Sequence, residues 1–517
     1  MKTNTILKGT LILTCAGIIT RLLGFYYRIF LTNAIGAEGL GLYQMVFPLN
    51  SICLAISSSG ISIAISRYTA AHFASGDKKH SKDSLIIGML LSLILAAASA
   101  AVLFFAAPVI AVHIFNDTRC ISLIRILSLS IPLAVIHNSI ASYYMGKSNA
   151  AVPAAAQLVE QIIRVGSVLL IFTIRESKGL PVSAATGMAG LLCGEAASCL
   201  FSLTACSLTA KDFRIKNPMN LTGKMLHMAV PLSLNRIILS FIHSMEAVLI
   251  PAMLRQNGLS ASESLSTYGI LSGMAFPLIM LPSTLINSFS AMLLPAVSGA
   301  TSNRHTESVK KTISTAYEYS MLIGIFCLGA FLIWGNEAGT LLFGVPQVGI
   351  YVTAFAWICP FLYISTTLAS ILNGLGKTKQ TLFLDVSCHL LKILLIVLLI
   401  PRMGITGFLI SFLVSEILLA LLSATFLNSL YSVTFDVFQF VIKPAFSLAV
   451  SAGVALYFKR IFAESALADI PILLLLLCGG IMGFVYCFFI FIVLKSRVSL
   501  NDSKQTQKSA ATQAKSS

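Results

Sequence analysis

Apolar runs of twenty or more residues recur from one end of this chain to the other. A helix needs about 20 such residues to cross the hydrocarbon core of a bilayer. Only 10% of the residues are charged and 57% are hydrophobic, whereas roughly 25% are charged in a soluble protein. The sequence therefore predicts an all-α polytopic protein of the cell membrane with about fourteen transmembrane helices.

The fourteen predicted spans cover residues 5–29, 40–65, 84–112, 121–145, 151–174, 182–208, 225–252, 267–297, 315–335, 348–373, 380–400, 404–428, 438–458 and 469–494. Orientation follows from Lys and Arg in the connections, which favour the cytoplasmic side. With the N-terminus inside, the inner segments carry 22 of these residues and the outer segments 8. Both termini are therefore predicted to be cytoplasmic, and the net charge of +16 needs no nucleic acid partner.

Two pairs of segments point to an internal duplication. SIPLAVIHNSIASYYMGKSN (130–149) matches ICPFLYISTTLASILNGLGKTK (358–379) at a shift of 228, with a two-residue insertion predicted near Gly374. VFPLNSICLAISSSGIS matches AFPLIMLPSTLINSFS at a shift of 229. The repeat holds six helices, an even number, so the two copies are expected to be parallel lobes related by an axis along the membrane normal.

This duplication predicts the domain organisation of the chain. Residues 1–215 form an N-lobe of helices 1–6, and residues 216–435 form a C-lobe of helices 7–12. Residues 436–495 add helices 13–14, and residues 496–517 form a disordered cytoplasmic tail. In parallel-repeat transporters the substrate site lies between the lobes near the bilayer midplane.

The first span carries two arginines, Arg21 and Arg28. A spacing of seven returns to nearly the same side of a helix, so one face presents both guanidinium groups. A charge near the bilayer centre costs roughly 2.5–3.5 kcal/mol on insertion scales, and such arginines usually face a cavity or a partner. The alternative is that Arg28 extends its side chain to the outer interface.

The seventh span carries Arg236, His243 and Glu246. In the repeat it corresponds to the first span, so Arg21, Arg28 and Arg236 are predicted to line a common substrate-binding space. Alternatively, Arg236 pairs with Glu246 or caps the cytoplasmic end of its helix. His243 and Glu246 are candidates for ion or proton coupling or for lining the cavity.

Two further spans carry ionisable residues at helical spacing. Glu160 and Arg164 are four residues apart and are predicted to form a structural ion pair within one helix. Asp385, His389 and Lys392 lie on one stripe and are further candidates for cavity lining or for ion or proton coupling. Glu195 and Glu416 are interpreted as isolated acids, and His137 as a core histidine.

Catalytic and metal-binding patterns such as HExxH and GxSxG are absent from the sequence. The 11 cysteines form no CxxC pair and are interpreted as small apolar residues. We therefore expect no enzymatic activity, no metal and no cofactor, with a coupling ion or the membrane potential as the energy source.

One stretch resembles a known family of exporters. Thr20-Arg21-Leu22-Leu23-Gly24-Phe25, followed by Arg28 and GAEGLGLYQMVFPL, is similar to the polysaccharide-export and lipid II flippase branch of the multidrug, oligosaccharidyl-lipid and polysaccharide exporter superfamily. The resemblance implies a flippase that moves a lipid-linked saccharide pyrophosphate, the peptidoglycan precursor lipid II, for spore cortex synthesis. It also implies a cationic central cavity, to which Arg21 and Arg28 would contribute. Some members carry an acid directly after the second arginine and an arginine in the second helix, whereas this chain has Ile29 and no cation just after Pro48.

Arginines suit a pyrophosphate cargo, because guanidinium groups bind phosphate bidentately and stay charged. The sequence leaves alternatives open. One is a cation-coupled multidrug exporter of the same fold, which would need an intramembrane acid. Others are a non-transporting scaffold that recruits cell-wall synthases, and a membrane-embedded transferase that would need acids in its loops.

Overall fold

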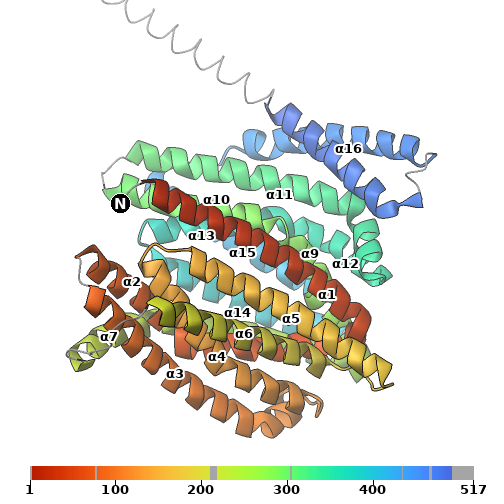
Figure 1. The fold of residues 1–517 in the computed structure, drawn as a ribbon. Coiled ribbons are helices and arrows are strands. Elements are labelled where there is room, and N and C mark those ends of the chain that lie inside the picture. Colours follow the sequence, from red (N-terminus) through yellow and green to blue (C-terminus); the bar gives the residue numbers. More distant parts are fainter. Residues whose placement is uncertain are drawn as a thin grey trace, which may run out of the picture. The chain divides into compact units, whose positions relative to one another are not determined.

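The computed structural model describes residues 3–75, 78–209, 218–302, 306–433, 435–464 and 469–491. Within these ranges the chain consists of helices joined by turns, without a β-strand (Figure 1). The predicted tail, residues 496–517, and the predicted boundary between residues 215 and 216 lie outside the described residues.

The helices follow one another along the chain. The α-helices are α1 (Thr3–Leu54), α2 (Gly60–Ala74), α3 (Lys78–Val109), α4 (Cys120–Gly146), α5 (Ala151–Ser177), α6 (Ala184–Thr209), α7 (Pro218–Gln256), α8 (Ala261–Tyr268), α9 (Phe276–Met280), α10 (Ser283–Ser302), α11 (Thr306–Phe343), α12 (Pro346–Phe355), α13 (Cys359–Gly374), α14 (Thr378–Met403), α15 (Ile405–Tyr431), α16 (Lys443–Phe462) and the helix Pro471–Phe491. Short π or 3-10 segments connect several of them: η1 (Ala55–Ser59), η2 (Ile110–Ile114), η3 (Gly269–Ala275), η4 (Ala356–Ile358) and η5 (Phe438–Ile442).

The predicted polytopic all-α fold is confirmed. Twelve helices of the described chain are long and apolar enough to cross a membrane, and the bent pair Ala261–Met280 and Ser283–Ser290 makes a thirteenth. The first two predicted spans count as one, because the helix runs on from Ile12 to Phe73. Each of the fourteen predicted spans therefore coincides with helix in the structure.

Gly36 separates the first two spans inside α1. Its backbone has φ 72° and ψ 175°, which is not helical. A side chain disfavours positive φ, whereas glycine adopts it at little cost. This glycine therefore bends the chain between two spans without a loop.

The chain forms two compact units. The first consists of Met1–Met274 with His389–Phe408, and the second of Ala275–Cys388 with Leu409–Ser517. The division into six-helix lobes at residue 215 stays a prediction.

Neighbouring helices of the first unit are held by side chains that bond to backbone carbonyls. The Tyr144 hydroxyl on α4 donates to the Ala205 carbonyl on α6 at 3.0 Å, and Ser198 on α6 donates to the Ala156 carbonyl on α5 at 3.2 Å. These bonds join α4, α5 and α6, which lie side by side (Figure 1). Polar contacts of this kind hold helices together where lipid provides no hydrophobic drive for their association.

One close helix crossing in the first unit is reciprocal. A Cβ atom on Gly41 of α1 would lie 2.1 Å from the carbonyl oxygen of Leu265 on α8. A Cβ atom on Gly269 would lie 2.1 Å from the carbonyl oxygen of Ala37. At the shift of 229 found for the neighbouring VFPL and AFPL segments, Gly41 and Gly269 are one position out of register, so nearly equivalent segments of the two repeats meet backbone to backbone.

In the second unit, Thr367 on α13 links three helices. Its hydroxyl donates to the Tyr363 carbonyl at 2.9 Å and accepts from Ser320 of α11 at 2.7 Å and from Ser290 of α10 at 3.4 Å. The surrounding apolar core includes the fully buried Tyr317 and Leu368. A buried hydroxyl with several partners avoids the cost of an unpaired polar group.

The two C-terminal helices also pack in the second unit. Trp334 of α11 forms an apolar cluster with Ala455 of α16 and with Cys478 and Met482 of the last helix. The Tyr486 hydroxyl donates to the Leu322 carbonyl at 2.9 Å. These helices are therefore attached to α11.

The turns after α4 and α13 show the duplication in backbone geometry. In the first turn, Lys147, Ser148 and Asn149 donate their amides to the carbonyls of Tyr143, Met145 and Tyr144. In the second, Leu375, Gly376 and Lys377 donate to Ile371, Asn373 and Leu372, so all three bonds recur at a shift of 228.

The predicted two-residue insertion near Gly374 is therefore wrong. The structural counterpart of Gly376 is Ser148, and both have positive φ, 75° and 57°. Aligning Gly146-Lys147 with Gly376-Lys377 requires the insertion. The backbone does not follow that alignment, because the left-handed residue of the turn is Ser148 in the first copy and Gly376 in the second.

The glycine crossing predicts that Gly41→Ala destabilises the protein. The added methyl group would overlap the Leu265 carbonyl, and such overpacking costs about 1–3 kcal/mol. Unfolding of the purified protein should therefore begin at a lower temperature, measured through the reaction of its buried cysteines with a thiol dye. Gly166→Ala on α5 is the control, because a Cβ atom there would meet no other atom within 4 Å; equal shifts in both variants would contradict the prediction.

Candidate transport site

The three arginines predicted to bind substrate lie on α1 and α7 of the first unit. Arg21 and Arg236 have exposed side chains, whereas that of Arg28 is partly buried. Arg28 lies within electrostatic reach of the Tyr27 and Tyr43 hydroxyls. Among the described residues, the structure records an acidic partner for neither Arg28 nor Arg236.

Tyr27 fixes the orientation of α1 next to Arg28. It is buried, and its hydroxyl donates to the Gly187 carbonyl on α6 at 3.2 Å. The next residue, Arg28, therefore has a guanidinium held near two phenols rather than near a carboxylate. Among the described residues, no carboxylate is recorded that neutralises this guanidinium.

Arg164 joins a larger polar group in the interior of the first unit. Its guanidinium forms an ion pair with Glu160 one turn away on α5, and lies 3.8 Å from Glu195 Oε1 on α6. His137 Nε2 on α4 lies 2.8 Å from Glu195 Oε2. Three helices thus share one cluster of charged and hydrogen-bonded side chains.

The sequence pattern shows the Glu160–Arg164 spacing but not the rest of this cluster. Glu195 is not isolated, because it is bonded to His137, and His137 is a core histidine whose ring is satisfied by this partner. They are 58 residues apart, so helical spacing carries no signal for the contact. Glu416 is not isolated either, because Ser365, the counterpart of His137 at the shift of 228, lies 3.3 Å from it in the second unit.

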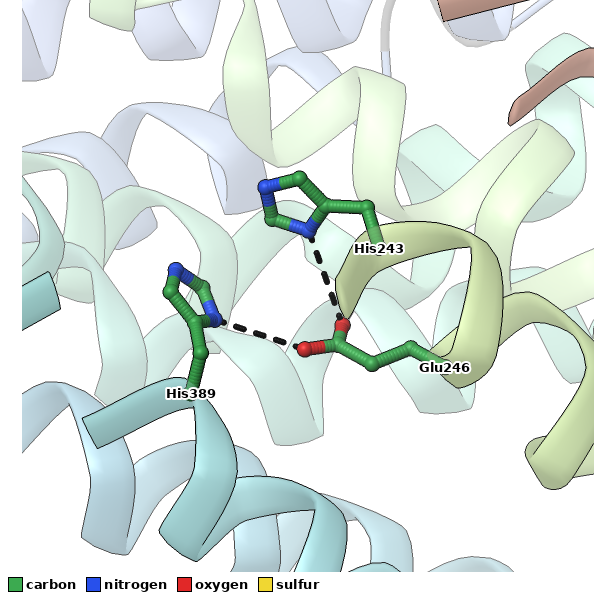
Figure 2. A group of neighbouring side chains, drawn as sticks. All are labelled: His243, Glu246 and His389. Atoms are coloured by element: carbon green, nitrogen blue, oxygen red, sulfur yellow. Dashed lines mark ion pairs between the residues drawn. The ribbon is translucent and has the colours of Figure 1, made fainter. Parts of the chain in front are cut away.

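A second charged group joins α7 and α14, as Figure 2 shows for three of its members. Glu246 Oε1 lies 2.8 Å from Lys392 Nζ and 3.3 Å from His389 Nδ1. His243 Nδ1 lies 3.9 Å from Glu246 Oε2, and the two imidazole rings meet edge to face at 4.9 Å. We call His243, Glu246, His389 and Lys392 the α7–α14 cluster.

The α7–α14 cluster decides between two expectations for Glu246. The alternative in which Arg236 pairs with Glu246 is wrong, because Glu246 pairs with the buried Lys392. Asp385, one turn before His389 on α14, is half-buried. Sequence spacing placed His389 and Lys392 on one stripe but gave no indication that Glu246, some 140 positions earlier, faces them.

Three side chains of the α7–α14 cluster also have the chemistry of metal ligands. One ligand atom from each of His243, Glu246 and His389 lies within 4.8 Å of the others. The Lys392 ammonium and His389 contact the same Glu246 oxygen, however. A metal cation bound there would be repelled by the charge of the ammonium.

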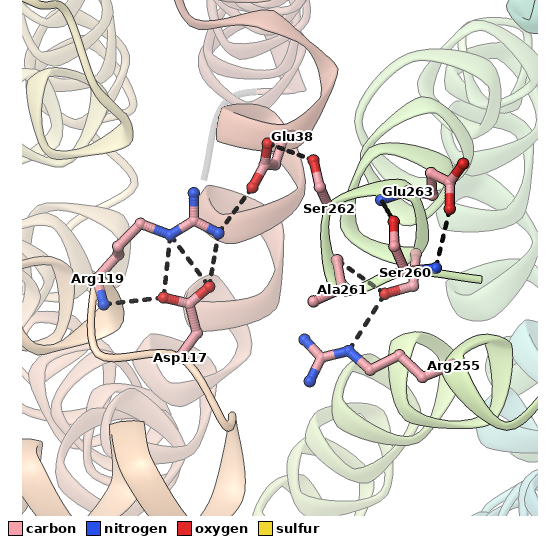
Figure 3. A network of polar contacts seen from close by, with 9 residues as sticks. Glu38, Asp117, Arg119, Arg255, Ser260, Ala261, Ser262 and Glu263 are labelled. Carbon is pink, nitrogen blue, oxygen red and sulfur yellow. Dashed lines mark hydrogen bonds and ion pairs between the residues drawn. The ribbon is translucent and has the colours of Figure 1, made fainter. Parts of the chain in front are cut away.

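A third polar network lies where α1 bends (Figure 3). Arg119 Nη2 lies 2.7 Å from both Glu38 Oε1 and Asp117 Oδ2, and Ser262 on α8 donates to Glu38 Oε2 at 2.7 Å. Partial burial of Asp117 opposes its ionisation, but the hydrogen bonds and charge of Arg119 outweigh this and lower its pKa. The network thus joins α1, the turn before α4, and α8.

The start of α8 is fixed within the same network. Ser260 and Glu263 form a capping box, with the Ser260 amide 2.9 Å from Glu263 Oε2 and the Glu263 amide 3.2 Å from Ser260 Oγ. Arg255 donates to Ser264 Oγ at 3.3 Å. Helical spacing gives no signal for these contacts, because Glu38 lies in another connection than Arg119, and the turn before α8 brings Arg255 and Ser264 together.

Comparison with known proteins places this geometry in context. The model of the polysaccharide biosynthesis protein family matches residues 6–301. Stage V sporulation protein B of Bacillus subtilis (strain 168) is 26% identical over 455 residues, covering 86% of this chain and 88% of that protein.

Two solved structures share the fold. The lipid II flippase MurJ in an inward closed conformation has a TM-score of 0.72 at 15% identity, covering 94% of this chain and all of that one, 100%. An inward-facing multidrug resistance MATE family transporter of the MOP superfamily has a TM-score of 0.66 at 14% identity, covering 80% of this chain and 96% of that one.

The family, the relative and the shared fold identify a multi-pass membrane transporter rather than an enzyme. The family match covers more than half of the sequence, including α1, α7 and all three arginines. This chain belongs to the polysaccharide biosynthesis protein family.

Proposed function

We propose that this transporter is a flippase that moves a lipid-linked saccharide pyrophosphate, the peptidoglycan precursor lipid II, across the cytoplasmic membrane for spore cortex synthesis. In this proposal both termini lie in the cytoplasm. The six-helix lobes 1–215 and 216–435 move so that the substrate site opens alternately to each side of the membrane. The similarity to a sporulation protein and the fold shared with a lipid II flippase support the choice of cargo.

One observation carries the proposal: arginines occur on the first helix of each repeat, and Arg28 and Arg236 have no recorded carboxylate partner among the described residues. A pyrophosphate cannot cross hydrocarbon without its charge being matched. Guanidinium groups match it bidentately at any working pH. In the proposed mechanism Arg21, Arg28 and Arg236 bind the pyrophosphate while the polyprenyl tail stays in lipid.

We assign the coupling of transport to proton binding to the α7–α14 cluster. Glu246 is surrounded by Lys392 and two histidines, so a proton added to the cluster changes its net charge and weakens the ion pair. Since α7 also carries Arg236, the protonation state of the cluster would be linked to the helix that holds substrate. Asp385 is assigned to the same path on α14.

The pairing of Glu246 argues against the multidrug exporter alternative. That function would need an intramembrane acid that attracts a cationic drug, whereas Lys392 lies 2.8 Å from this carboxylate. The carboxylate is therefore already neutralised by the protein. We retain the lipid-linked anion as the cargo class.

Removal of single arginines should slow transport strongly without affecting insertion. A hydrogen bond to a charged group contributes about 1.5–3 kcal/mol, so Arg28→Ala or Arg236→Ala should slow flipping roughly 10- to 100-fold. The readout is accumulation of lipid-linked precursor in the inner leaflet of cells that carry each variant as the only copy. Arg402→Ala, which removes an exposed arginine at the end of α14, is the control. Normal precursor levels in both Arg28→Ala and Arg236→Ala would exclude the mechanism.

Variants of the α7–α14 cluster should show whether the cluster couples transport to protons or only stabilises the fold. Glu246→Gln leaves Lys392 buried without its carboxylate, and breaking a buried pair costs about 3–5 kcal/mol. The double variant Glu246→Gln with Lys392→Met should recover the unfolding temperature, because no lone charge remains. Proton-driven transport should be lost in reconstituted vesicles of both variants, since the carboxylate that Lys392 and the two histidines share is gone. A stable double variant that transports with unchanged pH dependence would make the cluster purely structural.

A further inference from the structure

A cleft of about 700 Å³ opens between α2 and α7 in the first unit, away from the three arginines above. Arg67, Tyr68 and Ala71 line it from α2, and Gly223, Lys224, His227 and Met228 line it from α7. Known ligand pockets have volumes of about 300–1,000 Å³. The cleft is therefore large enough for a polar lipid headgroup.

The lining of this cleft is basic. Arg67, Lys224 and His227 are all exposed, and no carboxylate lines the cleft among the residues that the structure describes. The recorded side-chain partner of Arg67 is the thioether of Met228, with Nη1 at 3.8 Å from the sulfur. A thioether is a weak acceptor and carries no charge. Among the described residues, the guanidinium of Arg67 is thus not neutralised.

Close packing holds α2 and α7 together beside the cleft. Gly60 brings the two helices together, since its Cβ would lie 2.1 Å from the Ala229 carbonyl, and its amide donates to Ser233 Oγ at 3.2 Å. Ile65 on α2 and Met225 on α7 are fully buried in one apolar cluster. The two helices that carry the basic side chains are therefore packed against each other.

The cleft also lies near the ends of two helices that are long and apolar enough to cross a membrane. The candidate span that includes α2 ends at Phe73, and that of α7 begins at Leu221. At a rise of 1.5 Å per residue, Arg67 lies about 9 Å and Lys224 about 5 Å from these ends. Cations near the ends of membrane-spanning helices attract anionic lipid headgroups.

We infer that this cleft binds the phosphate of a membrane-anchored lipid. Arg67 provides a bidentate contact, Lys224 a point charge and His227 a further donor, while the acyl or prenyl chain stays beside α2 and α7 in the bilayer. Two lipids present this chemistry: an anionic phospholipid, and the pyrophosphate of a lipid-linked saccharide before transport. The second source rests on the proposed function, whereas the first does not.

The test measures lipid binding to the full chain in phosphatidylcholine nanodiscs. Phosphatidylglycerol and undecaprenyl pyrophosphate are added in separate titrations, and bound lipid is counted by native mass spectrometry. The double variant Arg67→Gln with Lys224→Gln should lose at least tenfold in apparent affinity. Lys377→Gln with Lys379→Gln removes the same charge elsewhere on the same predicted side and should lose less than twofold. Unfolding temperatures of both double variants show whether they are folded.

Each outcome has a defined meaning. Equal losses for the two lipids support a general lipid-phosphate site, and a loss confined to undecaprenyl pyrophosphate supports a loading site for the cargo. Losses for both lipids that match those of the lysine control overturn the inference. The phosphatidylglycerol titration does not depend on transport, so failure of the proposed flippase activity leaves it interpretable.

Discussion

The structure depends on the cost of placing charge in hydrocarbon. Charged groups inside a membrane are tolerated where they meet partners. Within the described residues of the first unit, Glu160, Arg164 and Glu195 form one such group, and Glu246 with Lys392 another. Arg28 and Arg236 differ from these because no carboxylate is recorded beside them. The contrast separates charges that are paired with other charges from charges that have no recorded carboxylate partner.

Hydroxyl groups solve the same problem for uncharged polarity. Ser57, like many serines of this chain, donates to the carbonyl four residues earlier, at 2.6 Å. Others connect helices, as Thr367 does in the second unit. Because lipid tails are as apolar as the helix surfaces, such bonds and close backbone approach hold the bundle. Both units thus use hydroxyl groups in the same two ways, within a helix and between helices.

The sequence predicted the fourteen spans because span length and apolarity are local properties, and the Glu160–Arg164 pair because four residues make one turn. It did not reveal the contact between His137 and Glu195 or between Glu246 and Lys392, because those partners are distant in sequence and meet only through packing. The turn alignment failed for a different reason. Letters were matched at Gly146 and Gly376, whereas backbone conformation matches Ser148 with Gly376. Residue identity can shift within a repeat while the hydrogen-bonded turn does not.

The crossing at Gly41 and Gly269 involves almost no side chains. Two backbones that touch directly place no demand on the volume or polarity of the residues around them. After a gene segment is duplicated, the copies are then free to accumulate different side chains elsewhere, such as His137 in one and Ser365 in the other. Symmetry of the pair survives at a few glycine positions, and each half can acquire its own chemistry without losing the join between them.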